Sequence, residues 1–123
     1  MTAIAVAITL CVGVLGSFGS AKADSLTFQI RSFHKNAVDV AFYSQNRKHV
    51  WPASDRVYVI RDFNVAQYKL SCVRGETICY GAAVKGNYSL YWGVGINGKK
   101  ACKGCCQTCG GDTVTVVHNL NER

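Results

Sequence analysis

Six cysteines in the second half of the chain have the residue type and spacing to do chemistry. They are Cys72, Cys79, Cys102, Cys105, Cys106 and Cys109. The last four form two adjacent C-x-x-C units, a spacing found in structural disulfides, in zinc sites and in thiol–disulfide exchange. A short exported chain keeps its cysteines as disulfides, because the space outside the cytoplasm is oxidising. We therefore expect three structural disulfides and no cofactor.

Two alternatives for the distal cysteines stay open. A zinc ion could be held by the four thiolates of Cys102, Cys105, Cys106 and Cys109, although four ligands within eight residues crowd a tetrahedral site. Thiol–disulfide exchange is the other alternative, but it commonly uses a C-x-x-C unit that opens a helix. The glycines at positions 104, 110 and 111 disfavour a helix here.

The spacing of the cysteines also suggests how they pair. Cys72 and Cys79 flank a turn over residues 73–77, and alternation places both side chains on the inward face. This arrangement predicts a disulfide between them across a hairpin. Adjacent cysteines form only a strained bridge, so Cys105 and Cys106 are each expected to pair with a more distant partner.

The segments that position these cysteines have the two-residue period of half-buried strands. We expect strands over residues 26–31, 37–44, 56–61, 67–72, 78–82, 88–94 and 113–117, the first two forming a hairpin. Residues 102–111 are too small and too rich in cysteine for regular structure. No window after the N-terminus has helical spacing of apolar residues. The sequence predicts an all-β fold: one small antiparallel β-sandwich-like domain, stabilised by disulfides.

The N-terminus resembles a secretory signal peptide. Residues 3–15 are almost wholly apolar, and Ala21-Lys22-Ala23 has the small residues that a signal peptidase requires. We expect a signal peptide over residues 1–23 and a mature domain over residues 24–123, periplasmic or secreted and without a stable membrane anchor. A retained N-terminal anchor is the alternative.

The charge indicates the kind of partner. Removal of Lys22 with the signal peptide leaves 13 basic and 7 acidic residues, a net charge of +6. Outside the cytoplasm this charge favours an anionic envelope polymer or glycan over nucleic acid. Solubility alone would also explain it, because the charges are scattered.

One candidate ligand surface lies between the two cysteine groups. Strand period places Trp92 inward and Tyr91 outward, with Gly93 and Gly95 allowing a bulge or the close approach of another segment. A turn at Asn97-Gly98 would bring Lys99 and Lys100 beside the ring of Tyr91. An aromatic ring beside lysines suits the face of an anionic sugar, so we expect Tyr91, Lys99 and Lys100 to contact the ligand.

Nothing in the sequence favours an enzyme. The histidines His34, His49 and His118 lie far apart, and no Gly-x-Ser-x-Gly motif is present. The internal carboxylates are few and are expected to be solvated surface groups: Asp39, Asp55, Asp62, Glu76 and Asp112. The prediction is a non-enzymatic binding or structural module of the cell envelope, with a zinc-binding or thiol-redox protein as the alternative.

Three segments together resemble a pattern in small exported bacterial proteins of unassigned role. They are Cys-Val-Arg-Gly-Glu-Thr-Ile-Cys-Tyr-Gly-Ala over residues 72–82, Tyr-Trp-Gly-Val-Gly over residues 91–95, and the cysteine cluster over residues 102–109. The resemblance implies export and a shared cysteine framework, and it implies no activity.

Overall fold

The computed structural model describes residues 23–121, so the predicted signal peptide lies outside the described residues except for Ala23. This part of the chain contains no helix. Its nine strands are β1 (Ala23–Ser32), β2 (Val38–Ser44), β3 (Val50–Trp51), β4 (Tyr58–Ile60), β5 (Val65–Val73), β6 (Thr77–Val84), β7 (Asn87–Gly93), β8 (Cys106–Thr108) and β9 (Thr113–Leu120). The predicted strands are therefore present, with boundaries that differ by a few residues.

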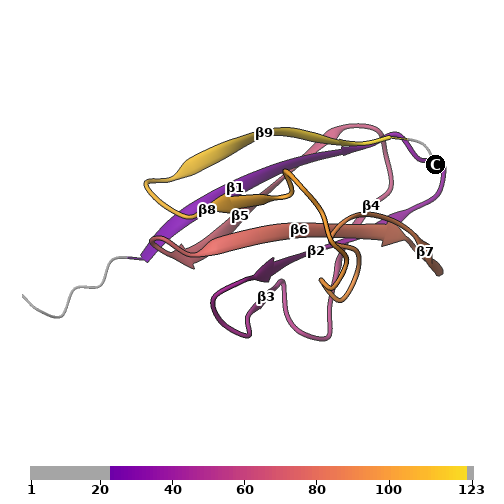
Figure 1. Ribbon diagram of the computed structural model, residues 1–123. Coiled ribbons are helices and arrows are strands. Elements are labelled where there is room, and N and C mark those ends of the chain that lie inside the picture. The colour runs from indigo at the N-terminus through magenta and orange to yellow at the C-terminus, as the bar shows by residue number, and fades with distance from the viewer. Residues whose placement is uncertain (1–22, 122–123) are drawn as a thin grey trace, which may run out of the picture.

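The strands form two packed sheets, which Figure 1 shows as two layers. One sheet has the order β5-β1-β9, and the other has the order β3-β2-β6-β7, with β4 paired to β2 and β8 paired to β6. The predicted disulfide-stabilised β-sandwich is confirmed. Its pairing is antiparallel except between β1 and β9, which run parallel.

The predicted hairpin of the first two strands is wrong. β1 pairs with β5 and β9, whereas β2 pairs with β6 in the other sheet. The apolar faces of the two strands meet across the core instead, where the ring centroids of Phe28 and Phe42 lie 4.8 Å apart. Alternation indicates which face of a strand is buried, but it does not identify the neighbouring strand.

The core fills the space between the two sheets. Leu26, Phe28 and Ile30 of β1 are fully buried, as the alternating pattern predicts. Both tryptophans are buried with their indole N–H groups satisfied: Trp51 donates to the carbonyl of Ser71 at 3.1 Å and Trp92 to that of Asn121 at 2.9 Å. Each ring thus contributes apolar area without leaving an unpaired donor.

Three disulfides connect the six cysteines, but the predicted Cys72–Cys79 bridge is wrong. The turn after Cys72 leads from β5 in one sheet to β6 in the other, so the two cysteines do not face each other across a hairpin. The bonds are Cys72–Cys109, Cys79–Cys106 and Cys102–Cys105. Their sequence separations of 37, 27 and 3 residues correspond to chain-entropy contributions of roughly 3.8, 3.6 and 1.6 kcal/mol.

The cysteine-rich segment contains regular structure that the sequence did not predict. β8 pairs antiparallel with β6, and the disulfide partners Cys79 and Cys106 face each other in this register. The amide of Tyr80 donates to the carbonyl of Cys105 at 3.0 Å, and the amide of Gly75 donates to that of Cys109 at 2.8 Å. Backbone bonds and sulfurs together hold a segment that lacks apolar periodicity.

Candidate ligand-binding site

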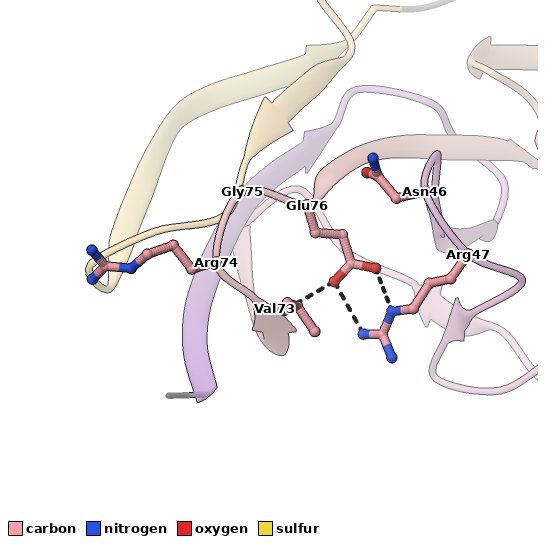
Figure 2. Close-up of a pocket in the computed structure, with 6 residues that line it drawn as sticks. All are labelled: Asn46, Arg47, Val73, Arg74, Gly75 and Glu76. Carbon is pink, nitrogen blue, oxygen red and sulfur yellow. Dashed lines mark hydrogen bonds and ion pairs between the residues drawn. The ribbon is translucent and has the colours of Figure 1, made fainter. Parts of the chain in front are cut away.

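Three of the hollows lined by residues 23–121 differ in charge. One of about 400 Å³, which we call the loop cleft, is lined by Tyr43, Ser44, Gln45, Arg47, Lys48, His49, Val50, Ser54, Asn97 and Gly98. A second, of about 320 Å³, surrounds Glu76 (Figure 2). A third, of about 340 Å³, has two carboxylates among its lining residues Asp24, Ser25, Lys69, Ser71 and Asp112. All three hollows have cationic lining residues, but among them only the loop cleft has no carboxylate in its lining.

The loop cleft is built where the end of β2 meets the loop after β7. The amide of Asn97 donates to the hydroxyl of Tyr43 at 2.8 Å. Asn97 and Gly98 both have positive φ, which confirms the predicted turn. A Cβ on Gly98 would lie 2.7 Å from the Tyr43 ring, so only glycine lets the turn pack so tightly on the ring.

A second close contact fixes the same loop to the sheet. A Cβ on Gly81 of β6 would lie 2.0 Å from the carbonyl oxygen of Gly95 and 3.0 Å from the Tyr43 ring. A Cβ on Gly93 would lie 2.2 Å from the carbonyl oxygen of Tyr80. The expected close approach at Gly93 and Gly95 is therefore confirmed. Gly95 is buried, so its backbone packs against protein and not against solvent.

The three predicted ligand residues lie beside the loop cleft and outside its lining. Tyr91 is half-buried, and the Lys100 ammonium group lies 5.3 Å from the centroid of its ring, within cation–π range. The amide of Lys100 donates to the carbonyl of Val94 at 3.0 Å. Lys99 is exposed. Lys99 directly follows Gly98, so its backbone adjoins the lining of the cleft.

The sequence missed the basic side of the cleft. Arg47, Lys48 and His49 are consecutive in the loop between β2 and β3, and all three line it. This run was visible in the sequence, but only the fold places it in one cleft with the Asn97-Gly98 turn. The loop is tied down at its base, because the amide of Ser44 donates to the carbonyl of His49 at 3.0 Å.

A buried carboxylate positions Arg47. Glu76 is only 4% exposed, and its carboxylate accepts four hydrogen bonds. Arg47 donates from Nε at 2.5 Å and from Nη2 at 3.0 Å, the hydroxyl of Ser44 at 2.5 Å and the amide of Val73 at 3.0 Å. Figure 2 shows the Arg47 fork meeting the carboxylate, whereas Arg74 extends away from it.

These contacts also determine the charge of Glu76. Burial raises the pKa of the carboxyl group, but the hydrogen bonds from Arg47, Ser44 and Val73 more than offset burial and lower the pKa to about 2. An acid so strong stays ionised at neutral pH and is a poor proton donor. Glu76 therefore acts as a structural anchor, and Arg47, which also lies 5.7 Å from the Trp51 ring centroid, is held at the cleft wall.

A second carboxylate expected at the surface is buried as well. Asp39 is 2% exposed and accepts a hydrogen bond from the Tyr88 hydroxyl at 2.6 Å and an ion pair from Lys85 at 3.3 Å. The hydrogen bond from Tyr88 to Asp39, with burial, raises the pKa of Tyr88 to about 12. Residues 38–42 of β2 are all buried, so both faces of this strand are covered. Asp39 is therefore buried with its neighbours Val38 and Val40.

The histidines are separated and each packs on aromatic rings. His34 lies edge-on to Trp92 at 5.8 Å between centroids, His49 lies 4.4 Å from Trp51, and His118 lies 4.8 Å from Tyr80. Burial lowers the pKa of His118. Within residues 23–121 no group of three or more His, Cys, Asp or Glu side chains is arranged to hold a metal ion.

No protein-family profile, curated protein or solved structure matches the chain. Residues 23–121 include no helix long and apolar enough to cross a membrane. The three disulfides indicate an oxidising environment. The fold thus defines a class, a small disulfide-stabilised β-sandwich, and its candidate site is a basic cleft between loops.

Proposed function

We propose that this protein is an exported, periplasmic or secreted, non-enzymatic module whose loop cleft binds an anionic glycan of the cell envelope. The observation that carries the proposal is the lining of the cleft, which has Arg47, Lys48 and His49 but no carboxylate. The charge of Arg47 is balanced by Glu76, so the net attraction comes from Lys48 and from Lys99 and Lys100, the two exposed lysines that follow Gly98 in the chain.

The polar lining supports a sugar ligand over a simple ion. The hydroxyl groups of Tyr43 and Ser54 and the amide of Gln45 can exchange hydrogen bonds with sugar hydroxyls, while the Tyr43 ring and Val50 provide apolar contact. The cleft is formed by the ends of β2 and β3 and by loops, two of them held by hydrogen bonds to or within the sheet. Such a preformed surface needs little reordering when it binds a polymer.

Binding should depend on Lys48 and Lys99 and not on the overall charge of the protein. We expect polygalacturonate, a polyuronic acid, to bind the mature protein at low salt, and neutral dextran not to bind. Lys48→Gln with Lys99→Gln should weaken polygalacturonate binding about tenfold, measured by isothermal titration calorimetry. Raising the salt concentration should weaken binding of the unmodified protein more than that of the variant.

The matched control removes the same charge elsewhere. Lys35→Gln with Lys69→Gln takes away two exposed lysines that do not line the loop cleft, and it should leave the affinity within twofold. Equal weakening by the two double variants would mean attraction by net charge alone. Failure of the unmodified protein to bind polygalacturonate would contradict a site for polyuronic glycans.

A further inference from the structure

The three disulfides differ in what they hold together. Cys72 of β5 is tied to Cys109, next to β8, and Cys79–Cys106 joins facing residues of β6 and β8. Cys102–Cys105 joins cysteines separated by three positions in the sequence, and neither of them belongs to a strand. Breaking this third bond would therefore release no strand from either sheet.

The sulfurs also differ in accessibility. Cys72, Cys79, Cys105 and Cys109 are each at most 3% exposed, whereas Cys102 and Cys106 are only partly buried. Cys106 lies within β8 and pairs in register with Cys79 of β6. The strand pairing therefore holds both ends of that disulfide in place. Cys102 lies in the loop before β8, and it is the partly exposed cysteine that no strand holds in place.

The charge around Cys102 favours an attacking thiolate. Lys99, Lys100 and Lys103 are exposed and lie within three residues of Cys102 in the sequence. No carboxylate occurs between Glu76 and Asp112. Positive charge near Cys102 attracts an anionic attacking thiolate.

We propose that Cys102–Cys105 is an exchangeable disulfide that oxidises an external dithiol, while the other two disulfides are structural. A thiolate of the dithiol attacks Sγ of Cys102, the Cys102–Cys105 bond breaks, and Cys105 leaves as a thiolate. The second thiol of the partner loses its proton and attacks the mixed disulfide, which releases Cys102 as a thiolate. The partner becomes a disulfide, two electrons reach the protein, and two protons convert both thiolates to thiols.

The fold holds Cys105 in place when the bond to Cys102 is reduced. The carbonyl of Cys105 accepts the amide of Tyr80, and its neighbour Cys106 is bonded to Cys79. Cys105 is 3% exposed and belongs to the core cluster, so it stays buried when Cys102 is released. The direction of attack follows from this difference, because Cys102 is the more exposed residue of the pair.

The test is graded reduction of the folded mature protein with dithiothreitol, followed by alkylation with N-ethylmaleimide and peptide mass mapping. We expect the first two modified cysteines to be Cys102 and Cys105, at a dithiothreitol concentration at least tenfold below that which opens the other bonds. Modification of Cys79 and Cys106 first, or of all six cysteines together, would overturn the proposal.

Two single variants test which sulfur is attacked. Cys105→Ser leaves a free thiol at Cys102 and should form a mixed disulfide with oxidised glutathione, detected as a mass increase. Cys102→Ser leaves the free thiol at the buried Cys105 and should react at least tenfold more slowly. Equal rates would overturn the assignment of Cys102, and far-ultraviolet circular dichroism checks that both variants remain folded. The outcome does not depend on glycan binding, so the two proposals fail separately.

Discussion

Replacing Gly81 with Ala should lower the free energy of unfolding by about 3 kcal/mol, the upper part of the range for overpacked sites. The new Cβ would lie 2.0 Å from the carbonyl oxygen of Gly95, closer than any real contact of this kind. The atoms that the new Cβ would meet belong to the Gly95 backbone and the Tyr43 ring, and neither can move aside by a simple side-chain rotation. The loop over residues 94–100 would have to lift from β6, taking Asn97 away from Tyr43.

Gly110 supplies the matched control for this substitution. It has no positive φ, and a Cβ placed on it would meet nothing within 4 Å. Gly110→Ala should therefore change the unfolding free energy by less than about 0.5 kcal/mol, as surface changes do. Urea denaturation of both variants measures the difference. Similar losses in the two would show that Gly81 is not in tight contact with the loop.

Replacing Glu76 with Gln should destabilise the protein by about 2.5 kcal/mol at pH 7, the cost of disrupting hydrogen bonds to a charged group. The four donors on Glu76 suit an oxygen at both carboxylate positions. A glutamine NH₂ group would instead face a donor, and the Arg47 guanidinium would lose its counter-charge. Because Arg47 is partly exposed, water limits the loss.

The unmodified protein and Glu76→Gln should also differ in how their stability responds to acid. The pKa of Glu76 is about 2 in the folded protein, below its ordinary value of 4.5, so the unfolded chain takes up the proton first. The stabilisation by the carboxylate is complete above pH 4.5 and disappears as the pH falls from 4.5 through 2. The stability difference between unmodified protein and Glu76→Gln should therefore narrow over that interval.

An exposed carboxylate gives the comparison for the acid experiment. Asp55→Asn alters a side chain in the exposed loop between β3 and β4. Its stability should follow that of the unmodified protein across the whole pH range, measured by thermal unfolding at each pH. A constant difference between the unmodified protein and Glu76→Gln down to pH 2 would mean that folding does not lower the pKa of Glu76.

Strand positions could be predicted from the sequence, because alternation reports burial directly. Alternation places Cys72 and Cys79 on the inward face, and both are buried. The partners of strands and cysteines could not be predicted in the same way. Two inward side chains on consecutive strands meet across a hairpin only if both strands lie in one sheet, and the turn between β5 and β6 changes sheets.

The candidate site was harder to predict, because distant segments meet to form it. Tyr91, Lys99 and Lys100 were selected from local period and a turn, and the structure brings Lys100 over the Tyr91 ring. The basic run at residues 47–49 shares a cleft with that turn only in the fold. The buried state of Glu76 also follows from the fold, since its donors come from β2, from the following loop and from Val73.

The parallel pairing of β1 with β9 determines when the molecule can become complete. β1, the middle strand of one sheet, is the first strand of the described chain, and its neighbour β9 is the last. Leu26 of β1 therefore cannot pair with β9 until the chain has folded back as far as Thr113. Sheets that depend on contacts between such distant residues fold slowly, since the intervening chain must first be closed into a loop. The Cys72–Cys109 bond shortens that search, because it ties the chain just before β9 to β5, which pairs with β1 along the edge opposite to β9. The reduced chain should therefore spend longer than the oxidised chain with β1 open along the edge that β9 fills.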